Sequence, residues 1–165
     1  MSGSPPVVYL LVGLPGSGKS TYARALERTG VVRLSVDERM RARHGRVGKD
    51  YPADQHLLLL GPVVDDVRRR LVELVRSGHS VVLDHGLGQR IERDGYKRLV
   101  VELGARWRLL SFRVERSELL RRLALRNDDP RFGVITAATL DWMAATSEEP
   151  EGEGEELVRA GEPAP

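Results

Sequence analysis

Short apolar runs alternate along most of the chain with longer stretches in which apolar positions recur every three or four residues. A short apolar run predicts a buried strand, and the three-to-four periodicity predicts an amphipathic helix. The apolar runs place strands over 7–12, 31–35, 80–83 and 107–114. The periodic stretches place helices over 19–28, 57–76, 89–103 and 117–126, with a further short helix around Leu140.

Strands that alternate with helices in this way are typical of an α/β fold. The pattern predicts a parallel sheet of four or five strands, helices on both faces and right-handed crossovers. Within the helix over 57–76, Gly61-Pro62 predicts a kink or a restart, because proline removes a backbone donor. Ligands of such sheets bind beyond the carboxyl ends of the strands, so we expect the functional residues along that edge.

The length of 165 residues suits one domain, which we expect over residues 7–146. Residues 1–6 and 147–165 are rich in Gly, Pro, Ser or Glu, and we expect a flexible N-terminus and a mobile acidic tail. The absence of cysteine excludes disulfides, thiolate metal sites and cysteine nucleophiles. The apolar run over 7–12 is too short to span a membrane and lacks the basic flank of a signal peptide. We therefore expect a cytoplasmic protein with no membrane partner.

The net charge of +2 is unevenly distributed. Residues 147–165 carry seven glutamates and one arginine, so the preceding residues have a net charge of +8. A basic body favours anionic partners, among which ATP would suffice and nucleic acid is the larger alternative. The other interpretation is that the arginines are spread over solvated faces.

The first predicted strand leads directly into Gly13-Leu14-Pro15-Gly16-Ser17-Gly18-Lys19-Ser20, which has the spacing G-x-x-x-x-G-K-S of a P-loop. Glycines at these positions let backbone N–H groups surround a phosphate, and the helix that follows directs its positive end at the same anion. Lys19 is expected to bind the β- and γ-phosphates, and the Ser20 hydroxyl is expected to bind Mg²⁺. The predicted nucleotide-binding residues of this segment are Gly13, Pro15, Gly16, Ser17, Gly18, Lys19, Ser20 and Thr21.

Two aspartates follow predicted strands and are expected near the P-loop. Asp37 comes just after the second strand, where a carboxylate can accept the proton of an attacking hydroxyl; the alternative is that it caps a helix. Asp84 ends the third strand, where it can hold Mg²⁺ or its waters or contact substrate; a turn or cap is again the alternative. The further candidates for binding the acceptor are Arg39, His85 and Arg90.

Arginines concentrate in the segment 119–132, which we predict to be a lid. Arg122 and Arg126 are four residues apart and therefore share one helix face, and Arg131 follows a turn at Asp129-Pro130. A closing segment of this kind delivers positive charge to the phosphate as it is transferred and excludes water. The alternative is a solvated helix face, on which Arg121 is the clearest surface residue.

Over residues 7–146 these features together resemble the P-loop kinases grouped as AAA-type ATP-binding domains, near zeta toxins, chloramphenicol phosphotransferase and bacteriophage polynucleotide kinase. The resemblance implies that Asp37 is the general base and that Arg126 first, and Arg122 second, contact the ATP phosphates. It also implies that Asp84 helps recognise the acceptor, with Arg90 or Arg93 nearby. A Glu-Pro-Pro signature of many relatives is kept only in part, at 147–151.

The sequence therefore predicts a Mg²⁺- and ATP-dependent kinase, and three functions remain open. The first is a phosphotransferase for a small molecule, with Tyr51, His56, His85 and Trp142 as pocket walls. The second is a 5′-hydroxyl polynucleotide kinase, favoured by the basic body. The third is an ATPase or nucleotide switch without an acceptor, which is disfavoured because Asp84 is followed by histidine rather than by a glutamate placed to polarise water.

Overall fold

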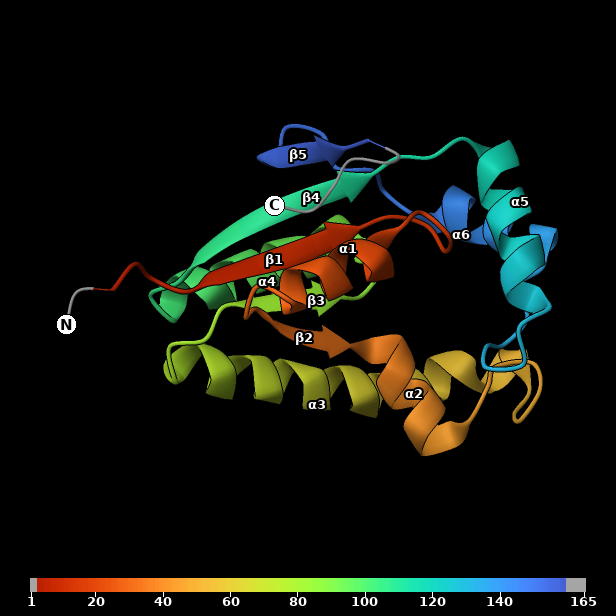
Figure 1. Cartoon of the computed structure of the whole chain (residues 1–165), viewed down its shortest axis with the longest axis horizontal. Helices are drawn as coiled ribbons and strands as arrows, with labels where there is room; N and C mark the ends of the chain where they lie inside the picture. Colours follow the sequence, from red (N-terminus) through yellow and green to blue (C-terminus); the bar gives the residue numbers. More distant parts are fainter. Residues whose placement is uncertain (1–2, 160–165) are drawn as a thin grey trace.

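The computed structural model describes residues 3–159, and its centre is a five-stranded parallel sheet (Figure 1). The strands are β1 (Val7–Val12), β2 (Val32–Ser35), β3 (Val81–Asp84), β4 (Arg106–Phe112) and β5 (Glu155–Val158), in the spatial order β2-β3-β1-β4-β5. The helices are α1 (Lys19–Glu27), α2 (Val36–His44), α3 (His56–Arg76), α4 (Arg90–Glu102), α5 (Arg116–Asn127) and α6 (Ala137–Thr146), with a short 3₁₀ helix at Ala53–Gln55. The predicted α/β fold with a parallel sheet is confirmed.

Alternate residues of the central strands enter two separate cores, one on each face of the sheet. Leu11 and Leu110 pack with α1, whereas Leu10, Leu83 and Leu109 pack with α3 and α4. All five of these leucines are essentially inaccessible to solvent. Burial of both faces explains why the strands are continuous apolar runs in the sequence rather than alternating ones.

The helices α5 and α6 form a third, smaller core beyond the carboxyl ends of the strands (Figure 1). Its buried residues are Leu119 and Leu123 from α5 and Leu140 from α6. The lid therefore has its own apolar contacts and is not simply a loop that lies over the sheet.

The long helix α3 runs without interruption through Gly61-Pro62, so the expected restart is wrong. Both residues are exposed, while Val63, Val67 and Leu71 continue the buried row against the sheet. This packing holds the helix together although proline lacks a backbone donor. Within residues 3–159 no helix combines the length and apolar character needed to cross a membrane.

Helix α2 was not predicted as an element, because its sequence has almost no helical periodicity and buries only Val36 and Met40. It begins at Ser35, whose side chain accepts a hydrogen bond from the backbone N–H of Glu38 at 3.2 Å. Ser35 is therefore the N-cap, and the alternative role of Asp37 as the cap is wrong. Asp37 instead lies in the first turn, where its side chain is free to face the ligand edge of the sheet.

Part of the predicted acidic tail belongs to the folded domain, so the expectation that all of 147–165 is mobile is wrong for the described part. Strand β5 pairs in parallel with β4, and just before it Glu153 accepts two hydrogen bonds from Arg93 at 2.8 and 2.9 Å. Both side chains of this ion pair are buried. The strand was missed because it has only four residues, of which the first two are glutamates. Residues 1–2 and 160–165 lie outside the described part of the chain.

We expect Glu153→Ala to lower the free energy of unfolding by about 3–5 kcal/mol, because the substitution leaves the buried Arg93 guanidinium without its counter-ion. Urea denaturation would measure the change. Glu151→Ala, at a neighbouring exposed position, is the matched control and should have little effect. Equal stability of the two variants would show that the ion pair does not fix the C-terminal segment.

Candidate active site

The P-loop between β1 and α1 has the backbone of an anion site. Gly16 and Gly18 adopt positive φ angles of 84° and 99°, which favour glycine because it has no Cβ. Helix α1 begins at Lys19 with Gly18 as its N-cap, and no side chain caps its first N–H groups. These donors and the positive end of the helix are therefore directed toward the place where the motif predicts phosphate.

The side chain of Lys19 lies within this loop and is half-buried. Its Nζ donates to the carbonyl oxygens of Gly13 at 2.5 Å and Leu14 at 3.0 Å. Burial lowers the pKa of Lys19 to about 8, although the negative charges of Asp37 and Asp84 act in the opposite direction. A phosphate would therefore stabilise the charged form of Lys19 more strongly than it would stabilise an exposed lysine.

Asp84, at the end of β3, is buried and accepts a hydrogen bond from Arg33 Nη1 at 3.2 Å. Burial raises the pKa of Asp84, while Ser20, Lys19 and Arg33 favour its charged form. Ser20 and Asp84, the two residues predicted to bind Mg²⁺, therefore lie near one another. Magnesium in nucleotide sites commonly uses one or two protein oxygens and completes its shell with phosphates and water, which fits a serine and an aspartate.

Asp37 lies on the same edge of the sheet and is exposed. Its charge acts on Lys19, on Asp84, and on Arg126 of the lid. It also acts on Tyr51 and His56, which form a hydrogen bond of 2.6 Å between the phenol oxygen and Nδ1 and stack with ring centroids 6.0 Å apart. The site thus combines the carboxylate predicted to act as a base with two of the four predicted pocket walls.

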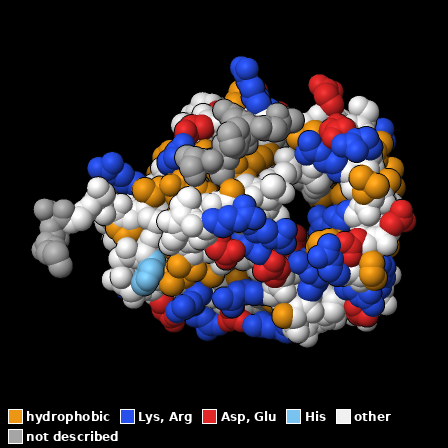
Figure 2. Space-filling model, viewed as in Figure 1, with side chains coloured by type: hydrophobic (Ala, Val, Ile, Leu, Met, Phe, Trp, Pro, Cys, Tyr) orange, Lys and Arg blue, Asp and Glu red, His pale blue; other side chains and the backbone are white. Residues whose placement is uncertain are grey.

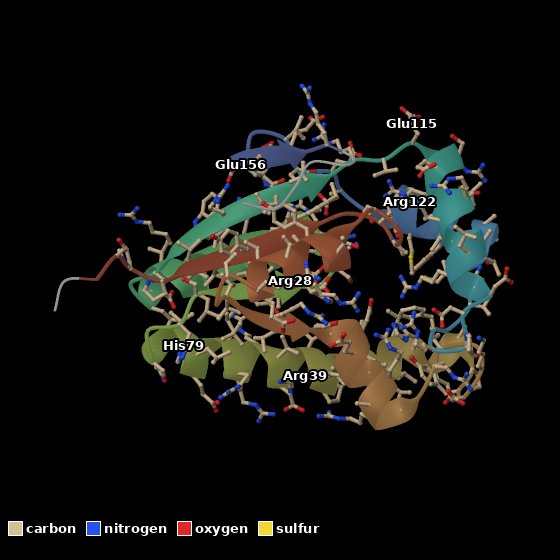
Figure 3. The ribbon with its side chains drawn as sticks, viewed as in Figure 1. Arg28, Arg39, His79, Glu115, Arg122 and Glu156 are labelled. Carbon is tan, nitrogen blue, oxygen red and sulfur yellow. The ribbon has the colours of Figure 1, made fainter. Side chains whose placement is uncertain are left out.

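The two lid arginines occupy different positions relative to the P-loop. Arg122 projects from α5 toward the P-loop, where its Nη1 donates to Gly16 O at 3.0 Å while its Nε is bound by Glu118 (Figure 3). Arg126 lies one helical turn further on, and its Nε is buried without a hydrogen-bond partner. Burial lowers the pKa of Arg126, and an unpaired buried donor of this kind favours an anionic ligand.

Comparison with protein families shows the family to which the chain belongs. Residues 8–150 match the family model described as AAA domain. The chain belongs to this family. A search among curated proteins finds no match. The solved structures that the domain resembles include kinases, and at these sequence identities the likeness shows a shared fold.

Three of these structures show the range of the fold. A chain of the Pnkp1/Rnl/Hen1 RNA repair complex is 22% identical with a TM-score of 0.71; the match covers 88% of this chain but 45% of that one. A gluconokinase from Sinorhizobium meliloti 1021 is 19% identical with a TM-score of 0.63, covering 98% and 86% of the two chains. The APS kinase CysC of Mycobacterium tuberculosis, solved with AMPPNP and APS, is 16% identical with a TM-score of 0.60, covering 96% and 91%.

Several predicted acceptor residues of this AAA domain lie away from the P-loop or are engaged elsewhere. In the view of Figure 3, Arg39 lies to the left of α2, away from the P-loop. His85 Nε2 lies 3.7 Å from Glu92, and Arg90 Nε lies 3.7 Å from Asp94 on the same helix. Trp142 is exposed on α6. Arg93, which the resemblance placed near the acceptor, is instead buried against the C-terminal segment.

Sequence analysis missed two residues that the fold brings to this edge, Arg33 and Arg41. Arg33 of β2 bridges Asp84 and Glu38, and Arg41 of α2 and Arg126 both lie over the ring of Phe132. Arg33 has one signal in the sequence, because it is a charged residue inside an otherwise apolar strand. Arg41 has none, since helix α2 is not periodic.

Nucleotide binding should weaken as the pH rises above about 8. The free protein loses the Lys19 proton in this range, whereas the bound phosphates keep the ammonium group charged, so binding requires proton uptake. The Kd for ADP should be flat with pH below this range and rise up to about tenfold for each pH unit above it. Calorimetry in buffers of different ionisation enthalpy would measure both the affinity and the proton uptake. A Kd independent of pH between 7 and 9.5 would contradict the buried environment of Lys19.

Proposed function

We propose that the protein is a kinase that transfers the γ-phosphoryl group of Mg²⁺-ATP to a hydroxyl group of a small-molecule acceptor. The observation that carries the proposal is the position of Asp37. This exposed carboxylate lies on the ligand edge of the sheet and interacts electrostatically with both the P-loop lysine and the lid Arg126. The members of the fold named above include kinases, which agrees with this assignment.

The residues of the P-loop would hold the nucleotide. Backbone N–H groups of 16–21 bind the phosphates, Lys19 neutralises their charge, and Ser20 with Asp84 would hold Mg²⁺. When bound, the metal withdraws charge from the phosphate oxygens. Within residues 3–159 no group of three or more acidic or histidine side chains forms a cluster able to hold a metal, consistent with a site that has few protein ligands.

Asp37 would act as the general base. Its carboxylate accepts the proton of the acceptor hydroxyl while the hydroxyl oxygen forms a bond to the γ-phosphorus and the bond to the ADP oxygen breaks. Arg126 and Arg122 would hold the transferred group from the lid side. The buried Nε of Arg126 has no hydrogen-bond partner and is available to donate to a phosphate oxygen. Arg122 would exchange the Gly16 carbonyl for a phosphate oxygen.

A 5′-hydroxyl polynucleotide kinase is the second candidate. Two observations favour it: the net charge of +8 over residues 1–146, and the TM-score of 0.71 to a chain of an RNA repair complex. A nucleic acid acceptor would bind more weakly as salt is added, because phosphates beyond the reacting end are also neutralised. A nucleotide switch or ATPase, the third candidate, would instead release phosphate at a rate independent of any hydroxyl compound.

Asp37→Asn should reduce phosphoryl transfer by about 10²–10⁴-fold, since the amide cannot accept the proton, and should leave ATP affinity nearly unchanged. The assay incubates the protein with Mg²⁺ and γ-labelled ATP, and offers 5′-hydroxyl oligonucleotides and a pool of nucleosides, sugars and hydroxylated antibiotics in separate reactions. Lys19→Ala is the companion variant and should lose both binding and transfer.

The place where the label is found distinguishes the three candidate functions. Label on a small molecule, lost in Asp37→Asn, supports the proposal, and label on the oligonucleotide supports the second candidate. Label found only in free phosphate favours the third. Normal transfer by Asp37→Asn would show that another group is the base.

A further inference from the structure

The ring of Phe132, in the segment after α5, is surrounded by three guanidinium groups. The Cζ atoms of Arg41, Arg126 and Arg131 lie 5.1, 4.7 and 5.4 Å from the ring centroid. Arg131 has a carboxylate partner, because its Nη2 lies 2.7 Å from Asp129. Arg41 and Arg126 form no ion pair with any residue in 3–159. Two half-buried cations thus lie against one aromatic ring, and no carboxylate of the described residues forms an ion pair with either of them.

Arg41 lies on the acceptor side of the site. It follows Asp37 by four residues in α2, so the two side chains share a helix face with Cβ atoms about 5–6 Å apart. His44 continues this face, and its ring packs edge-on against Tyr51 at a centroid distance of 6.4 Å. Arg126, Arg122 and Lys19 approach from the lid and the P-loop, where the nucleotide is expected. Arg41 therefore faces the compound whose hydroxyl reaches Asp37.

The segment that carries Phe132 is attached to the loop between α2 and the 3₁₀ helix. Lys49 Nζ donates to Phe132 O at 2.9 Å, and Arg46 Nη1 donates to Pro130 O at 2.7 Å. Gly133 lies so close to this loop that a Cβ would be 2.5 Å from Val47 O. The contacts close a frame around the site, and Figure 2 shows a hollow there with Lys and Arg side chains around it. An enclosed frame favours a small acceptor over the end of a long polymer.

The charges around Phe132 favour an anion in this hollow. Burial lowers the pKa of Arg126, and the positive charge of Arg41 lowers it further, although Asp37 and Asp84 act in the opposite direction. A carboxylate or phosphate between the two guanidinium groups would offset their repulsion, and planar guanidinium groups bind both anions through paired hydrogen bonds. Asp37 cannot serve as that anion if it acts as the base, because it must remain available to the hydroxyl.

We propose that Arg41 binds an anionic group, a carboxylate or a phosphate, of the small hydroxyl compound that accepts the phosphoryl group. The proposal rests on the kinase function above and defines its acceptor: a molecule with a hydroxyl at Asp37 and an anionic group a few bonds away. Phe132 holds the Arg41 guanidinium in place, and Lys49 and Arg46 hold Phe132.

The test compares acceptors that differ in the anionic group. Gluconate is paired with sorbitol, and adenosine 3′-monophosphate is paired with adenosine; a 5′-hydroxyl oligonucleotide is offered separately. We expect at least one anionic compound to be phosphorylated with a kcat/KM about tenfold or more above its neutral partner. Arg41→Gln should raise the KM for that compound about tenfold more than it raises the KM for ATP. The matched control is Arg43→Gln, whose arginine lies on the same helix but is paired with Asp66.

Equal effects of Arg41→Gln and Arg43→Gln, or no preference for the anionic compounds, would overturn the proposal while leaving the kinase function intact. Phosphorylation of the oligonucleotide in preference to both small anions would overturn the assignment to a small molecule. Calorimetric titration of gluconate and adenosine 3′-monophosphate into the ADP-loaded protein provides a readout that does not need turnover. Binding by the natural protein that is lost in Arg41→Gln supports the anion site, whether or not an acceptor is phosphorylated. Binding without phosphorylation of any acceptor would count against the kinase function and not against the anion site. Absence of binding by both compounds would overturn the anion site.

Discussion

The parallel direction of the five strands is the constraint on which the site depends. Because every strand points the same way, the residues that follow β1, β2 and β3 meet at one edge of the sheet. The P-loop, Asp37 and Asp84 come from separate parts of the sequence and are brought together by this direction alone. Reversal of any one strand would move its residue to the opposite end of the sheet.

The site concentrates charge that the rest of the fold must tolerate. Asp84 is buried next to Lys19 and Arg33, and both of these cations favour its charged form. Burial of charged groups opposes folding unless partners offset the loss of hydration. Here some partners are missing, most clearly at Arg126, and the two apolar cores of the sheet must compensate. Incomplete pairing of this kind is typical of a site that binds charged ligands.

The lid is separated from the two sheet cores and packs through a small cluster of its own. Its other attachments are polar: Arg122 binds the P-loop carbonyl of Gly16, and two carbonyls of the segment after α5 accept from Arg46 and Lys49. Apolar packing within the lid preserves its internal geometry, while polar contacts can exchange for ligand oxygens or water. The division agrees with a part that moves as a unit relative to the sheet.

The sequence alone determined the P-loop, the alternation of strands and helices, and the two aspartates after strands, because these depend on local spacing and on apolar runs that must be buried on both faces. It did not reveal α2 or β5, whose residues are mostly polar and are ordered by contacts distant in sequence. It also placed Arg93 near the acceptor, whereas the fold buries that residue against Glu153. The tertiary structure alone decided that Arg41 and Arg126, 85 positions apart, share the ring of Phe132. No local pattern encodes such a pair, since it exists only where α2 and the lid meet across the site.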